Sequence, residues 1–174
     1  MATTIEQLHT ALASAYPLTV ILSPEEDRIE KLLGRFAAVI KPEALPMATW
    51  NCLDGFRDRP ASADPVAALT WVAEEAPRGF YLFKDLHAML AGNRGLLRRL
   101  RDTAATVRNT RRFIFLLGPS FLVPDELKPL TYVVTSLFPD ESEVSAVVTA
   151  LLQQARRNVD PDALQLLIGS LRGM

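Results

Sequence analysis

The stretch TVILSPEEDRIEKLL, residues 19–33, joins an apolar run directly to an amphipathic helical pattern. Residues 19–22 are apolar at nearly every position, which is typical of a strand covered on both faces of a parallel sheet. Ser23 is a favourable helix N-cap, Pro24 suits the first helical position, and Glu26 completes a Ser-x-x-Glu capping box. We therefore expect a helix that begins at Pro24, capped by Ser23, with no loop between strand and helix.

Similar apolar runs recur along the chain, each bounded by turn residues and separated by helical patterns. This alternation predicts an α/β fold: a doubly wound, mostly parallel five-stranded sheet with helices on both faces. Residues 54–65, DGFRDRPASADP, are a candidate mobile surface loop or a plain connector. The expected strands are 19–22, 48–53, 80–83, 113–117 and 132–137, and the expected helices are 5–15, 24–40, 65–75, 94–109, 141–157 and one that begins at Asp160.

The composition bounds the class of protein. The chain has 174 residues, 49% of them hydrophobic, which is enough for one domain with a full core. Its 19 basic and 20 acidic residues leave a net charge of −1, so a nucleic acid or an anionic membrane would need a local patch. The apolar runs are shorter than the about 20 residues that cross a bilayer, and no secretory leader is recognisable. We expect a cytoplasmic protein without a membrane partner, and the single Cys52 excludes an intramolecular disulfide.

The turn after the first strand bears on nucleotide binding. In phosphate-binding α/β proteins this strand feeds a glycine-rich loop whose backbone N–H groups hold the phosphates, followed by Lys and Ser/Thr. No Gly-x-x-x-x-Gly-Lys-Ser/Thr occurs in the sequence. Glu25, Glu26 and Asp27 would also place three carboxylates at the positive end of the helix dipole, where they repel phosphate. We therefore expect no cofactor in this segment.

A second candidate site follows the apolar run in GFYLFKDLHAML, residues 79–90. One interpretation makes Asp85 an acid that organises Mg²⁺ or water, with His87 beside it. The other makes Asp85 a cap of the helix or turn that follows. Two ligands fall short of the three or four that metal sites normally use, so we favour the capping interpretation and expect no metal. Cys52 lies on the expected second strand, where a buried, inert thiol is expected.

The run RFIFLLGPSFLVPDELKPLTYVVTSLFPDESEVSAVVTALL, residues 112–152, resembles the second half of an AAA ATPase core. Together with YPLTVILSPEEDRIEKLL and GFYLFKDLHAML, it is similar to the N-terminal region of the AAA ATPase-like proteins of bacteria, cyanobacteria and plastid genomes. In that family a degenerate AAA-like region without nucleotide motifs precedes a true AAA module. The resemblance covers nearly all of residues 5–174.

The resemblance implies a P-loop NTPase or AAA-like core without the phosphate loop over residues 1–139. Residues 140–174 would be C-terminal helices, the start of a lid-like or linker segment that is cut from a longer polypeptide. At the AAA motif positions, the phosphate loop is replaced by residues 23–27, and the acidic pair survives only as Asp85, followed by Leu86. Ser120 alone could act as the polar sensor, and Lys128 is the one cation where an arginine finger would be sought.

The function implied is a non-catalytic, AAA-like N-terminal domain that serves as a regulatory, partner-binding or assembly module of a larger ATPase. ATP and Mg²⁺ would belong to the downstream AAA module, and this segment itself would not be an enzyme. The alternative is a stand-alone metal- or nucleotide-dependent hydrolase that uses Asp85 and His87. A receiver-like domain ranks last, because it would need a paired acid after the first strand and a Lys at the end of the fifth.

Basic side chains recur at helical spacing in the segment 94–109. They form either a docking stripe for an acidic partner or nucleic acid, or a solvated helix face. Nucleic acid is not favoured, because the chain lacks a basic excess and aromatic residues do not interleave with the stripe. The partners expected are the downstream AAA module, a neighbouring subunit or another, unidentified protein. The possible interaction surface comprises Arg94, Arg98, Arg101 and Arg108.

Overall fold

The computed structural model describes residues 3–40, 42–57 and 59–135, together with 145, 148, 149 and 152. The chain divides into two units, Met1–Ser136 and Leu137–Met174, and the fold described below is that of the first. The expected helices after residue 140 fall almost entirely outside the described residues. The division at residues 139 and 140 therefore stays a prediction.

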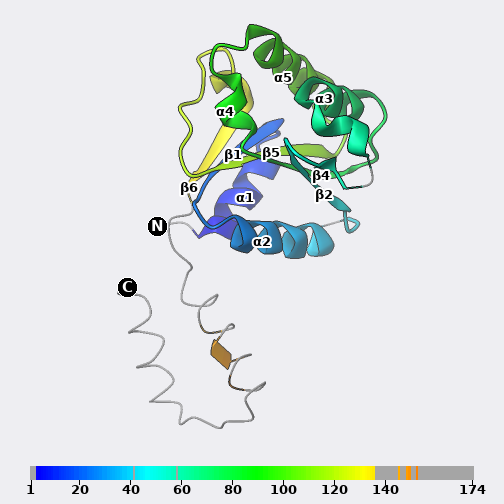
Figure 1. Ribbon diagram of the computed structural model, residues 1–174. Coiled ribbons are helices and arrows are strands. Elements are labelled where there is room, and N and C mark those ends of the chain that lie inside the picture. The colour runs from blue at the N-terminus through cyan, green and yellow to red at the C-terminus, as the bar shows by residue number, and fades with distance from the viewer. Residues whose placement is uncertain are drawn as a thin grey trace. The chain divides into compact units, whose positions relative to one another are not determined.

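A mostly parallel sheet forms the centre of the first unit (Figure 1). Its six strands have the order β3-β2-β4-β5-β1-β6, and every neighbouring pair is parallel except β2 and β3. The predicted doubly wound architecture is confirmed, with six strands in place of five. The elements are α1 (Thr4–Ala13), β1 (Leu18–Leu22), α2 (Glu26–Val39), β2 (Met47–Asn51), β3 (Gly55–Phe56), η1 (Pro60–Ala63), α3 (Pro65–Glu74), β4 (Gly79–Lys84), α4 (Leu86–Leu90), α5 (Arg94–Val107), β5 (Arg112–Gly118), η2 (Lys128–Leu130) and β6 (Thr131–Thr135).

The sixth strand, β3, lies inside the stretch that the sequence predicts to be a surface loop or connector. Phe56 is buried, with its ring centroid 5.1 Å from that of Trp71 and 5.5 Å from that of Phe83. The Phe56 N–H donates to the Ser62 hydroxyl at 2.8 Å, and the Trp50 indole N–H donates to the Ser62 carbonyl at 2.6 Å. The loop prediction is wrong here because one buried aromatic anchors a segment whose composition is otherwise polar.

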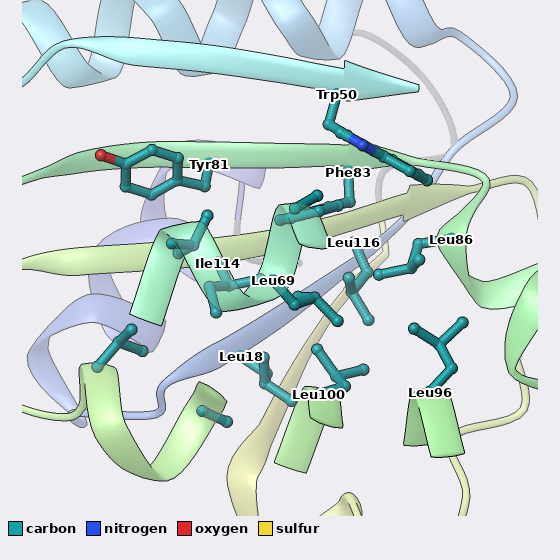
Figure 2. Packing of buried hydrophobic residues seen from close by; sticks show 14 of the residues in the cluster. Leu18, Trp50, Leu69, Tyr81, Phe83, Leu86, Leu96, Leu100, Ile114 and Leu116 are labelled. Carbon is teal, nitrogen blue, oxygen red and sulfur yellow. The ribbon is translucent and has the colours of Figure 1, made fainter. Parts of the chain in front are cut away.

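Helices cover both faces of the sheet. In Figure 1, α3, α4 and α5 lie on one side of the sheet, and α1 and α2 lie on the other. The strand β1 serves both cores, because Leu18 and Val20 pack on the α3/α5 side whereas Ile21 packs on the α1/α2 side. This is why the strands are apolar at nearly every position. Figure 2 shows part of the first core, in which Phe83 and Leu116 of the sheet meet Leu69 and Leu100 of the helices.

The order of the strands determines where a ligand site could form. The chain leaves β1 through α2 on one face, and it leaves β5 through a segment that packs with the α3/α5 core on the other. In open α/β sheets, ligands bind outside the carboxyl ends of the strands where such connections diverge. The carboxyl ends of β1, β4 and β5, called the carboxyl edge below, are therefore the place to look for a site.

Candidate functional site

At the end of β1 the backbone is already engaged. The Ser23 N–H donates to the Gly118 carbonyl at 3.0 Å, which continues the pairing of β1 with β5. The Ser23 hydroxyl accepts from the Glu25 N–H at 3.2 Å, and α2 begins only at Glu26, with Glu25 in the N-cap position. The prediction of a helix that begins at Pro24 and is capped by Ser23 is wrong. Since Ser23 is buried and held by β5, a short turn must precede the helix.

The carboxylates at the start of α2 are paired within the molecule. Glu25 forms an ion pair with Arg28 at 2.8 Å. The Lys84 ammonium, at the end of β4, lies 2.7 Å from a Glu30 carboxylate oxygen and 3.6 Å from one of Glu26. The Thr49 hydroxyl of β2 donates to Glu30 at 2.8 Å. This Lys84 network, made of Glu26, Glu30, Thr49 and Lys84, ties the first turns of α2 to two strands.

The pKa values of the network reflect this pairing. Burial alone would raise the pKa of Glu30, but hydrogen bonds from Lys84 and Thr49 outweigh it and hold that pKa below its ordinary value. Burial likewise would lower the pKa of Lys84, but the two carboxylates outweigh it and raise that pKa. Both groups are therefore charged at neutral pH.

Sequence reasoning missed this network. The carboxylates were expected at the positive end of the helix dipole, and their pairing with Lys84 was not predicted. The available signal was the pair Glu26 and Glu30, four residues apart on one helix face, together with a lysine at the end of a buried strand. Neither feature indicates the other until α2 is placed beside β4.

Asp85 and His87 both lie at the carboxyl edge, but in different settings. The Asp85 N–H donates to the Leu117 carbonyl at 3.1 Å, and its backbone is left-handed with φ of 57°. Asp85 occupies the N-cap position of α4, as the capping interpretation expects, yet its exposed carboxylate makes no capping hydrogen bond. The described residues contain no group of three or more His, Cys, Asp or Glu that could hold a metal ion.

The His87 ring fills the space beside the end of β5. A Cβ at Gly118 would clash with His87 Cε1, so position 118 accepts only glycine while the ring is there. The centroid of the ring lies 5.6 Å from that of Phe121. These contacts show a packing role for His87 at the point where the connections of the sheet diverge.

Three other residues singled out from the sequence, Cys52, Ser120 and Lys128, do not add to a site at this edge. Cys52 is exposed in the turn after β2, so the prediction of a buried thiol on a strand is wrong. The reason is that β2 ends at Asn51, whose side-chain oxygen accepts from the N–H groups of Leu53 and Asp54 and starts the turn. Ser120 is exposed, and Lys128 is paired with Asp125.

The four arginines of the possible interaction surface are all exposed. Asn93 caps α5 by accepting from the Leu96 N–H at 3.0 Å, so Arg94 is the first helical residue. Arg108 follows directly after the helix. Within the described part of the chain no helix is long and apolar enough to cross a membrane.

Comparison with known proteins identifies the family of this chain. Residues 4–136 match a family described as "SpoVK-like AAA ATPase, N-terminal domain". An uncharacterized AAA domain-containing protein ycf46 from Trieres chinensis is 24% identical over 177 residues, which is 97% of this chain and 35% of the relative. The chain thus spans about a third of the length of that relative.

Two solved structures share the fold. Domain III of the Thermotoga maritima replication initiation protein DnaA has a TM-score of 0.52 at 15% identity, covering 92% of this chain and 73% of that one. A chain of the E. coli MS115-1 HORMA:CdnC:Trip13 complex has a TM-score of 0.59 at 13% identity, covering 92% and 61%. At these identities the likeness shows a shared fold and nothing further.

Proposed function

The chain belongs to the family of SpoVK-like AAA ATPase N-terminal domains, and we propose that it is a non-catalytic domain that regulates, assembles or binds partners for a larger AAA ATPase. The curated relative is named for an AAA domain and is about three times as long as the matched region, which leaves room for a separate nucleotide-hydrolysing module. In this proposal ATP and Mg²⁺ act at that module.

The observation that carries the proposal is the occupied carboxyl edge. A phosphate site needs free backbone N–H donors and an uncommitted cation at a helix N-terminus. Here the Ser23 N–H is bonded to Gly118, and Lys84 is paired with Glu26 and Glu30. The His87 ring takes up the space beside Gly118. A nucleotide would have to displace ion pairs and a packed ring, and it would then meet carboxylates.

Calorimetric titration of the chain with ATP-Mg²⁺ tests the proposal directly. We expect no binding heat up to about millimolar nucleotide, and no rise in Tm on adding ATP. A rise in Tm would report binding, because a ligand at about 100 times its Kd stabilises the fold by about 2.7 kcal/mol. Titration with MgCl₂ alone is the control. Micromolar binding of ATP would overturn the proposal.

A second experiment asks whether ATP is excluded by repulsion from the carboxylates or by the absence of a phosphate-binding loop. The double substitution Glu25→Gln, Glu26→Gln removes two carboxylates from the start of α2. We expect no gain in ATP affinity, since removing repulsion creates neither the loop of N–H donors nor a free lysine. A gain to micromolar affinity would show that the site is a masked nucleotide site.

The hydrolase hypothesis and our proposal predict different effects of substituting Asp85. An exposed carboxylate that organises a metal ion would be essential for turnover, so Asp85→Ala would abolish a phosphatase or ATPase activity measured on this chain. Under our proposal Asp85→Ala changes no activity. Among the described residues no third His, Cys, Asp or Glu joins Asp85 and His87 in a group that could hold a metal ion, which favours the proposal over the hydrolase.

A further inference from the structure

The outer side of α5, continued by its C-cap residue Arg108, carries a line of arginines. It is called the arginine face below and comprises Arg94, Arg98, Arg101 and Arg108. At about 100° per residue these positions fall within an arc of about 80°, and at about 1.5 Å per residue they extend over about 20 Å. The opposite side of the helix is apolar. Its buried residues are Leu96, Leu100, Thr103, Ala104 and Val107.

The arginine face points away from the core. In Figure 2, Leu96 and Leu100 rise from α5 toward the sheet, and both are fully buried. The arginines lie on the other side of the same helix, and all four are exposed. Their guanidinium groups therefore do not contribute to packing against the sheet.

Most of these charges have no partner within the described residues. Arg98 pairs with Asp102 at 3.0 Å, whereas no ion pair joins Arg94, Arg101 or Arg108 to any acid described. Arg94 is the first residue of α5, and the first turn holds no acidic residue. A cation there faces the positive end of the helix dipole, which is unfavourable for stability. The stability of the fold thus gives no reason for this placement.

We propose that the arginine face docks an acidic segment of a partner protein, one that presents carboxylates along about 20 Å. The inference deepens the proposed function, because it assigns a surface and a partner chemistry to the partner-binding role. The guanidinium fork binds a carboxylate through two parallel hydrogen bonds, and a row of such forks recognises a row of acids. The chain as a whole has a net charge of −1, so this face is a local patch and not part of a general basic surface.

A protein partner fits better than nucleic acid. The segment RGLLRRLRDTAATV of α5 contains no aromatic residue on which bases could stack. A second copy of this chain fits less well, because the acids at the start of α2 are largely paired with Arg28 and Lys84. The occupant that we propose is therefore an acidic segment of another protein.

Fluorescence anisotropy with a labelled acidic peptide tests the inference. The probe is a helical peptide of about 16 residues with glutamates three and four positions apart, and its glutamine counterpart is the peptide control. The test variant is Arg94→Gln, Arg101→Gln, Arg108→Gln. The matched control variant, Lys31→Gln, Arg35→Gln, Arg57→Gln, removes the same charge from exposed positions elsewhere.

We expect the test variant to bind the glutamate peptide about tenfold more weakly than the unmodified chain, because three ion pairs are lost, and the control variant to bind nearly as well. Equal weakening in both variants, or no binding by the unmodified chain, would overturn the inference. Tighter binding of a thymidine oligonucleotide of the same net charge would overturn it in favour of nucleic acid. ATP titration of the same variants reports separately on the non-catalytic role, so the two proposals can fail independently.

Discussion

The helices α2 and α5 are both 14 residues long and amphipathic, yet they use their outer charges in opposite ways. They cover opposite faces of the sheet, and each buries one apolar side. On α2, acids occupy the first turn, where the dipole favours them, and Arg28 and Lys84 pair with Glu25, Glu26 and Glu30. On α5, Arg94 occupies the first turn against the dipole. The acids at the start of α2 thus pair within the fold, whereas Arg94, Arg101 and Arg108 form no ion pair with any acid among the described residues.

We expect the largest losses of stability from substitutions on the buried sides of α2 and α5, and we expect them to be similar for the two helices. Leu33 of α2 and Leu100 of α5 are both fully buried. We expect Leu33→Ala and Leu100→Ala each to lower the free energy of unfolding by about 2 to 5 kcal/mol, through lost apolar burial and a cavity. Urea denaturation measures both values. If one substitution cost less than about 1 kcal/mol, that helix would not be part of the cooperative core.

The next effect concerns the Lys84 network of α2. The Lys84 side chain is only 18% exposed, and Lys84→Met should cost about 1 to 2 kcal/mol at neutral pH, since Glu30 loses a charged hydrogen bond. Arg98→Met on α5, which breaks the exposed pair with Asp102, should cost less than about 0.5 kcal/mol. Equal costs in urea denaturation would remove the contrast between the two helices.

The pH dependence of the Lys84→Met effect sharpens this prediction. The pKa of Glu30 is lowered in the folded state, so its contribution is present above the unfolded value of about 4.3 and is lost as pH falls through the folded value. The pKa of Lys84 is raised, so its contribution is present below about 10.4 and is lost as pH rises through the folded value. The stability difference between Lys84→Met and the unmodified chain should therefore be greatest between about pH 5 and 9. A difference that persisted unchanged at pH 3 would show that the ion pair is not its source.

A smaller effect distinguishes how the two helices begin. Asn93 caps α5 through its side chain, so Asn93→Ala should cost about 1 kcal/mol. Ser23 bonds Glu25 in the turn before α2 and does not cap the helix, so Ser23→Ala should cost about 0.5 kcal/mol. Thermal unfolding of the two variants side by side gives the order. A larger loss of stability in Ser23→Ala than in Asn93→Ala would mean that the Ser23 hydroxyl contributes more to the start of α2 than the Asn93 cap contributes to the start of α5.

The last effect is a gain in stability. Replacing Arg94 by Glu puts an acid at the positive end of the α5 dipole, and we expect stability to rise by about 0.3 to 1 kcal/mol. Arg101→Glu, in the middle of the same helix, is the control and should change stability by less than about 0.5 kcal/mol. A loss of stability in Arg94→Glu would show that Arg94 has a favourable interaction within the fold, which would weaken the docking inference.

Much of the fold could be predicted from residue patterns. The strands β1, β4 and β5 were expected nearly as observed, because burial on both faces requires apolar residues at successive positions. The short strand β3 was not, because its pairing depends on Phe56 meeting Trp71 and Phe83, which lie elsewhere in the chain.

The site was less predictable than the fold. The missing glycine-rich loop was visible in the sequence, and so were Asp85, His87 and the arginines of α5. Their settings were not. That Asp85 would leave its carboxylate without a capping bond depends on its left-handed backbone, and that Cys52 would be exposed depends on where β2 ends.

By itself, the sequence determined most of the long strands and helices, and that no phosphate loop follows β1, since these follow from the spacing and chemistry of neighbouring residues. Only the tertiary structure decided that Lys84 pairs with Glu26 and Glu30, and that the His87 ring rests against Gly118. Each of these contacts joins residues far apart in the chain. The order and register of the parallel strands bring them together, and local propensities do not carry that information.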